Sequence, residues 1–149
     1  MGPKKEASDR LPWVSALYLL AALIGASVAI REDLPGEFAG RSSGHNASAD
    51  FFKGTGTVLS PGLAILSAHS IFMALSTRSG KAGKSGVAGL TLLGVAATVG
   101  MVGEPITYRV LSPKGFDPPK AALVAALTLL PSSMSVLGVK RLLAMSKEG

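Results

Sequence analysis

Four long stretches without a charged side chain dominate this sequence and restrict the folds that it can adopt. They cover residues 11–30, 54–77, 85–103 and 121–139. A helix rises about 1.5 Å per residue, so about 20 apolar residues cross the roughly 30 Å of hydrocarbon in a bilayer. Each stretch is close to that length, and the pattern therefore predicts membrane-spanning helices.

The same stretches argue against soluble mixed or β-rich folds. Their apolar residues show no alternation with period two and no short strands set between turns. Hydrophobic residues make up 48% of the 149 residues, and the mean hydropathy is +0.42. We expect an all-α integral membrane protein, a four-transmembrane-helix bundle that forms a single membrane domain over residues 1–149. The expected helices cover about 11–30, 56–77, 85–108 and 118–143, and residues 31–53 form an outer loop.

Small residues recur every four positions in the first stretch, at Ala21, Gly25 and Ala29. They predict a groove that receives a neighbouring helix. A basic start followed by an apolar core also resembles a secretory signal peptide. The apolar run is longer than the usual signal core of about 7 to 15 residues, which favours an uncleaved helix. Both interpretations stay open.

The distribution of Lys and Arg predicts the orientation in the membrane. With four spans, the amino-terminal tail, residues 78–85 and the carboxyl-terminal tail share one side and hold three basic residues each. With the acids counted, this side carries the whole net charge of +6. Short basic loops stay in the cytoplasm, so we expect a multi-pass protein of the plasma membrane with both termini cytoplasmic. Because the basic residues flank apolar spans, no nucleic acid partner is expected.

Several kinds of site are not expected from the residues present. The absence of cysteine excludes disulfides, thiolate metal sites and dithiol relays. His45 lies in a loop without partners at the spacing of metal ligands, so we expect no metal. Gly83-Lys84-Ser85 resembles the end of a phosphate-binding loop, but Arg78 occupies the position of the required glycine and no strand precedes it. We expect neither a nucleotide nor another cofactor.

One candidate site is a layer of polar side chains at a common depth. His69, the only ionisable residue of the second stretch, lies about 5 Å to the cytoplasmic side of the midplane if the stretch is centred on the bilayer. Tyr18, Thr91, Ser132 and Ser133 fall near the same level. We expect an uncharged His69 that faces the interior and bonds a hydroxyl of another helix. The alternative is a set of ordinary interhelical hydrogen bonds without a functional role.

The second candidate site is the Glu104-Pro105 step at the end of the third stretch. Proline lacks an N–H and clashes with the carbonyl one turn back, which predicts a break that turns Glu104 inward. Tyr108 is a candidate donor to the carboxylate, and Arg31 or Arg109 is a candidate ion partner. Without a cation, burial raises the pKa of such an acid. The alternative is an exposed interfacial ion pair, which contributes only about 0 to 1 kcal/mol.

The sequence assigns no catalytic residue, because neither site has a nucleophile and base or a set of metal ligands at a suitable spacing. We expect a non-enzymatic accessory subunit or a small-ligand-binding or transport component. Its partners would be membrane lipid and either another membrane protein or a second copy of the chain. The alternative is a membrane enzyme that acts on a lipid or quinone-like substrate, with Glu104 or His69 in proton transfer. A closed pocket joining His69 to Tyr18 and Ser132 would favour a transporter or enzyme, and a solid alanine-glycine core would favour a subunit.

Overall fold

The computed structural model describes residues 3–38, 41–42 and 44–147. In this part of the chain there are six helices and two short antiparallel hairpins. The first two residues of the predicted amino-terminal tail, residues 39, 40 and 43 of the predicted loop, and the last two residues of the carboxyl-terminal tail lie outside the described residues. The helices are α1 (Pro3–Arg31), α2 (Ala47–Lys53), α3 (Leu63–Ser76), α4 (Gly80–Gly103), α5 (Pro105–Leu111) and α6 (Pro118–Ser146). The hairpins pair β1 (Glu37–Phe38) with β2 (Arg41–Ser42), and β3 (Gly56–Thr57) with β4 (Ser60–Pro61).

Three of these helices are long and apolar enough to cross a membrane. They are the Arg10–Arg31 part of α1, the whole of α4, and α6. The predicted second span differs, because residues 56–61 form the β3–β4 hairpin and α3 has only 14 residues. A helix of that length covers about 21 Å, which is short of the hydrocarbon thickness. The predicted helix over 56–77 is therefore wrong in its first two turns.

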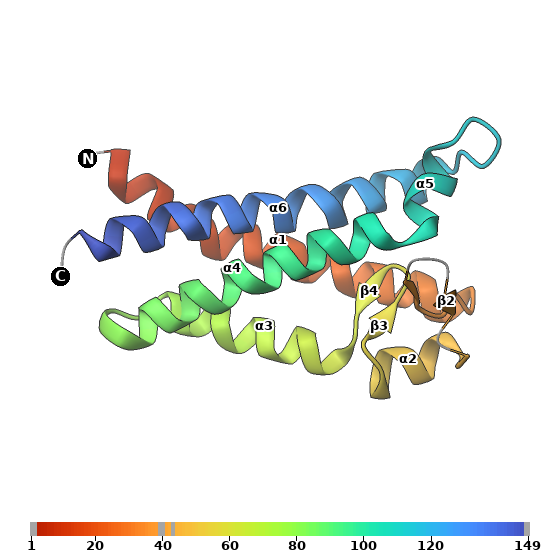
Figure 1. Ribbon diagram of the computed structural model, residues 1–149, viewed down its shortest axis with the longest axis horizontal. Coiled ribbons are helices and arrows are strands. Elements are labelled where there is room, and N and C mark those ends of the chain that lie inside the picture. The colour runs from red at the N-terminus through yellow and green to blue at the C-terminus, as the bar shows by residue number, and fades with distance from the viewer. Residues whose placement is uncertain (1–2, 39–40, 43, 148–149) are drawn as a thin grey trace.

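The long helices lie side by side, and α6 packs against both α1 and α4 (Figure 1). Helix α3 packs mainly on α4, to which a tight turn joins it. The amino-terminal end of α1, the carboxyl-terminal end of α6 and the α3–α4 turn lie at one end of the molecule, while both hairpins, α2 and α5 lie toward the other end. This arrangement places the three basic segments together.

Local sequence signals explain several helix boundaries. The side chain of Asn46 accepts a hydrogen bond from the Ala49 N–H at 2.8 Å and caps α2, as such a residue is expected to do. Asp117 caps α6 in the same way through the Lys120 N–H, and Pro118 follows as the first helical residue. Both helices therefore begin where a capping residue stands in the sequence. Arg141 of α6 donates to the Ser76 carbonyl at 2.9 Å and so satisfies the end of α3.

Glycines let α4 approach its neighbours closely. A Cβ at Gly86 would collide with the backbone of Ser76, and a Cβ at Gly89 would collide with the Phe72 ring. On the other side of the helix, Thr91 fills the space left by the missing side chain of Gly138 in α6. Small residues therefore allow close helix packing near the α3–α4 turn.

The groove predicted on α1 is occupied differently from the expectation. Ala21 and Ala29 are buried in the core. A Cβ at Gly25, however, would collide with the carbonyl oxygen of Leu59, which lies in the turn between β3 and β4. The groove thus receives the β3–β4 hairpin at this position, and a neighbouring helix does not fill it.

Large apolar side chains are exposed on the outer faces of the long helices. A soluble monomer rarely exposes so much contiguous apolar surface. This surface is suited to contact with hydrocarbon. Examples, with at least half of each residue exposed, are Leu17, Leu20, Leu92, Val99, Leu129 and Leu143.

Candidate functional site

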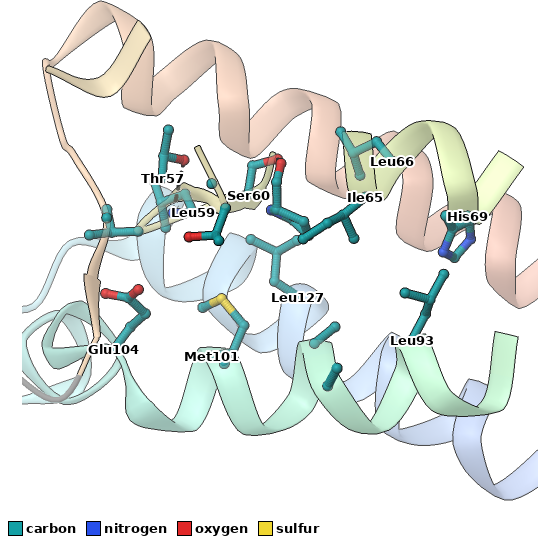
Figure 2. Close-up of a pocket in the computed structure, with 18 of the residues that line it drawn as sticks. Thr57, Leu59, Ser60, Ile65, Leu66, His69, Leu93, Met101, Glu104 and Leu127 are labelled. Atoms are coloured by element: carbon teal, nitrogen blue, oxygen red, sulfur yellow. Dashed lines mark hydrogen bonds between the residues drawn. The ribbon is translucent and has the colours of Figure 1, made fainter. Parts of the chain in front are cut away.

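A cavity of about 440 Å³ lies among α1, α3, α4, α6 and the two hairpins. Figure 2 shows Glu104 at one end of it and His69 at the other, with Met101 and Leu127 between them. The volume falls in the range of about 300 to 1,000 Å³ that is usual for small-molecule sites. The two places that the sequence indicated separately thus belong to one cavity.

The middle of the cavity is apolar. Its walls include Leu66 of α3, Leu93 and Met101 of α4, and Leu127 of α6. Counted along α4 from Leu93 to Glu104, the cavity is about 16 Å long. The apolar part of a ligand can therefore contact these walls between the polar groups at the two ends.

Small residues on α4 leave the space that forms the cavity. Gly89 packs directly on α3, but Ala96 and Gly100, farther from the α3–α4 turn, line the cavity instead. A Cβ added at Gly100 would meet no atom within 4 Å. Small residues thus allow close helix contact in one half of α4 and leave open space in the other half.

The β3–β4 hairpin and the segment after α1 cover the Glu104 end of the cavity. Thr57 and Ser60 are buried, and Leu59 is fully buried against α1. Gly36 and Glu37 line the cavity beside them. Irregular backbone at membrane depth is tolerated where it is buried in protein or lines a cavity, and this hairpin does both.

Glu104 lies at the break between α4 and α5, where Pro105 begins the new helix. The predicted break is therefore present. The freed carbonyl of Met101 accepts hydrogen bonds from the Glu104 N–H and the Thr107 hydroxyl. Glu104 is 8% exposed, and its carboxylate accepts a hydrogen bond from the Glu37 N–H at 3.3 Å.

The charge state of Glu104 follows from its surroundings. Among the described residues no ion pair reaches its carboxylate. Burial raises the pKa of Glu104 from 4.5 to about 7, while the hydrogen bond from the Glu37 N–H lowers it and the Glu37 carboxylate raises it. The carboxyl group therefore exchanges a proton near neutral pH.

The three predicted partners of Glu104 have other positions. Tyr108 is exposed, and its hydroxyl donates to the Val102 carbonyl at 2.8 Å, so the predicted bond to the carboxylate is wrong. The Pro105 break is the reason, because it leaves carbonyls of the last α4 turn open to side chains of α5. Arg109 is exposed in the last turn of α5, and Arg31 is exposed at the end of α1.

At the opposite end of the cavity, His69 is 2% exposed and faces the interior, as predicted. Its Nε2 lies 3.2 Å from the backbone carbonyl oxygen of Ser15 in α1. A carbonyl only accepts, so Nε2 carries the hydrogen, and Nδ1 of the uncharged ring is an acceptor. The predicted partner was a hydroxyl, and this is corrected to a carbonyl. The Tyr18 ring lies beside the imidazole, with 5.3 Å between ring centroids.

The rest of the predicted polar layer does not join this pair. Thr91 donates to the Val87 carbonyl of its own helix at 2.7 Å. Ser132 donates to the Thr128 carbonyl and lies 3.2 Å from the Thr98 hydroxyl, away from the cavity. Ser133 is exposed, beside a shallow groove between α1 and α6. Hydroxyls in helices commonly bond the carbonyl one turn back, and here that local bond decides the outcome.

Sequence reasoning missed the residues of the β3–β4 hairpin and the apolar walls. Gly54, Gly56, Pro61 and Gly62 are turn-forming residues placed close together, and they could have indicated the hairpin. The apolar wall residues carry no comparable signal, since leucines fill every predicted span.

The described residues contain no group of three or more His, Asp or Glu side chains that could hold a metal ion. No protein-family model, no curated protein and no solved structure matches this chain.

Proposed function

We propose that the chain is an integral protein of the plasma membrane with both termini in the cytoplasm. In this proposal α1, α3, α4 and α6 form a four-helix bundle, and α3 reaches the far side of the membrane through the β3–β4 hairpin. The apolar outer faces of the long helices support it, as does the position of the three basic segments at one end of the molecule.

Within that membrane, we propose that the chain is a non-enzymatic component that binds or transports a small ligand. The observation that carries the proposal is the cavity that runs from Glu104 to His69 and Tyr18. A subunit that served only as a scaffold would be expected to have a solid core, because empty space costs packing energy. The lining is apolar with a few polar groups at its ends, which is typical of ligand sites.

The ligand of this proposal comes from the lipid phase. Ile65 of α3 and Ala96 of α4 line the cavity, and both residues are exposed. Both lie on helices whose outer faces would contact hydrocarbon. A molecule dissolved in the bilayer can therefore reach the cavity between α3 and α4 without crossing water.

The test compares what co-purifies with two variants of α4. Gly100→Phe places a ring in the cavity, and Val99→Phe places the same ring on the exposed face one residue earlier. Replacing a glycine inside a helix does not weaken the helix, so both variants should fold. Native mass spectrometry should find a bound small molecule on the native chain and on Val99→Phe, and none on Gly100→Phe. Equal occupancy of both variants, or none on the native chain, would refute ligand binding in the cavity.

A second candidate is a membrane enzyme in which Glu104 transfers a proton. The observation that favours it is the pKa of about 7 beside an apolar cavity. Lipid profiles of cells that carry the native chain or Glu104→Gln test this candidate. A product that disappears in Glu104→Gln would support an enzyme, whereas unchanged profiles with retained ligand would support a binding protein.

A further inference from the structure

The His69 end of the cavity holds polar groups that a purely apolar ligand would leave without partners. Tyr18 is 3% exposed and lines the cavity, and its hydroxyl has no hydrogen-bond partner among the described residues. His69 uses Nε2 on the Ser15 carbonyl, which leaves Nδ1 as an acceptor. A donor or acceptor that a ligand covers without supplying a partner weakens the binding of that ligand.

At the Glu104 end, a ligand does not have to supply a hydrogen-bond partner. The Glu104 carboxylate already accepts the Glu37 N–H. Exposed Thr55 and Arg41 line the cavity beside it, so water reaches this end. The polar group that a ligand must supply therefore belongs at the Tyr18 and His69 end.

The side chains at the Tyr18 and His69 end restrict the kind of polar group that a ligand can place there. The described side chains around it offer a phenol and an imidazole but no carboxylate, ammonium or guanidinium, so a charged head group would be buried without an ion partner. A hydroxyl can accept from the Tyr18 O–H and donate to His69 Nδ1 at the same time. A ketone or ether can only accept and would leave the imidazole nitrogen without a partner.

We propose that the ligand is a membrane-soluble alcohol, with its hydroxyl between Tyr18 and His69 and its hydrocarbon chain extending along α4 toward Glu104. This inference rests on the proposed ligand-binding function. The cavity length of about 16 Å matches an extended chain of about twelve carbons, from ordinary bond geometry.

The experiment measures binding of four probes with the same chain length to the purified chain, by titration in native mass spectrometry. The probes are dodecanol, dodecane, dodecanoate and dodecylamine. Dodecanol should bind most tightly. Tyr18→Phe keeps the ring and removes the hydroxyl, so it should weaken dodecanol about three- to tenfold and leave dodecane unchanged or more tightly bound. Tyr108→Phe is the matched control, because Tyr108 is exposed and lies outside the cavity.

The readout is the ratio of dodecanol to dodecane affinity within each variant, which partial misfolding would not alter because it lowers both signals. An equal affinity for dodecanol and dodecane, or a preference for a charged probe, would overturn the alcohol class while leaving ligand binding intact. A ratio of dodecanol to dodecane affinity that Tyr18→Phe leaves unchanged would also overturn the alcohol class. If no probe binds, or if Gly100→Phe leaves the binding of every probe unchanged, the proposed function itself fails.

Discussion

The carboxylate of Glu104 accepts a hydrogen bond from the backbone N–H of Glu37, which lies 67 positions earlier in the chain. This bond joins the break in the α4–α5 region to the segment that follows α1. It also places an acid with a pKa of about 7 at the mouth of an apolar cavity. Proton binding by Glu104 is therefore linked to the stability of this end of the fold.

The first prediction concerns the pH dependence of stability. The folded-state pKa of Glu104 is raised from 4.5 to about 7, so the folded state holds this proton more tightly than the unfolded state. Stability should be greatest below pH 4.5, fall as the pH rises, and level off above about 7, with a total loss on the order of 3 kcal/mol. Thermal unfolding in detergent over this pH range measures the effect.

Glu104→Gln should abolish that pH dependence, because the amide does not titrate. Glu32→Gln is the control, since Glu32 is about half exposed and pairs with Lys120 at the surface. Parallel pH profiles for the native chain and Glu104→Gln would contradict the prediction.

The second prediction concerns the contact between α1 and the β3–β4 hairpin. Gly25→Val should destabilise the fold by about 1 to 3 kcal/mol, because its side chain would collide with the Leu59 carbonyl. Gly100→Ala adds a methyl group where no atom lies within 4 Å and should leave the melting temperature unchanged or raise it. A melting temperature for Gly25→Val equal to that of Gly100→Ala would argue against the hairpin position.

The third prediction concerns topology, and the absence of cysteine makes it simple to test. Ser48 of α2 and Ser85 near the start of α4 are both exposed, at opposite ends of the molecule. A membrane-impermeant maleimide should label Ser48→Cys from outside intact cells and should label Ser85→Cys only after the membrane is opened. The reverse pattern would overturn the proposed orientation.

Much of the fold follows from local chemistry and could be predicted. The break at Pro105 and the caps at Asn46 and Asp117 depend on residues within one turn of the boundary. The β3–β4 hairpin has a weaker local signal, because Gly56 and Pro61 favour a turn but Val58 and Leu59 between them are apolar enough to continue a helix. Its position depends on the missing side chain of Gly25, a contact between distant parts of the chain.

The sequence predicted two residues of the candidate site but not the cavity that connects them. Glu104 and His69 are conspicuous as ionisable residues at or within apolar stretches, and both are buried. Their connection through one cavity depends on how α3 diverges from α4, which the periodicity of either helix does not encode. The depth of Thr91 and Ser132 in the membrane could be predicted, but the direction in which each side chain points could not.

Photolabelling inside the membrane tests most directly whether the cavity holds a lipid-phase ligand. A dodecanol that carries a diazirine on its chain would be added to membranes containing the native chain, irradiated, and located by tandem mass spectrometry. The proposed function predicts labels on cavity residues such as Leu66, Met101 and Leu127, and excess dodecanol should remove these labels. Labels confined to exposed residues such as Leu92, Val99 and Leu129, unaffected by excess dodecanol, would contradict it.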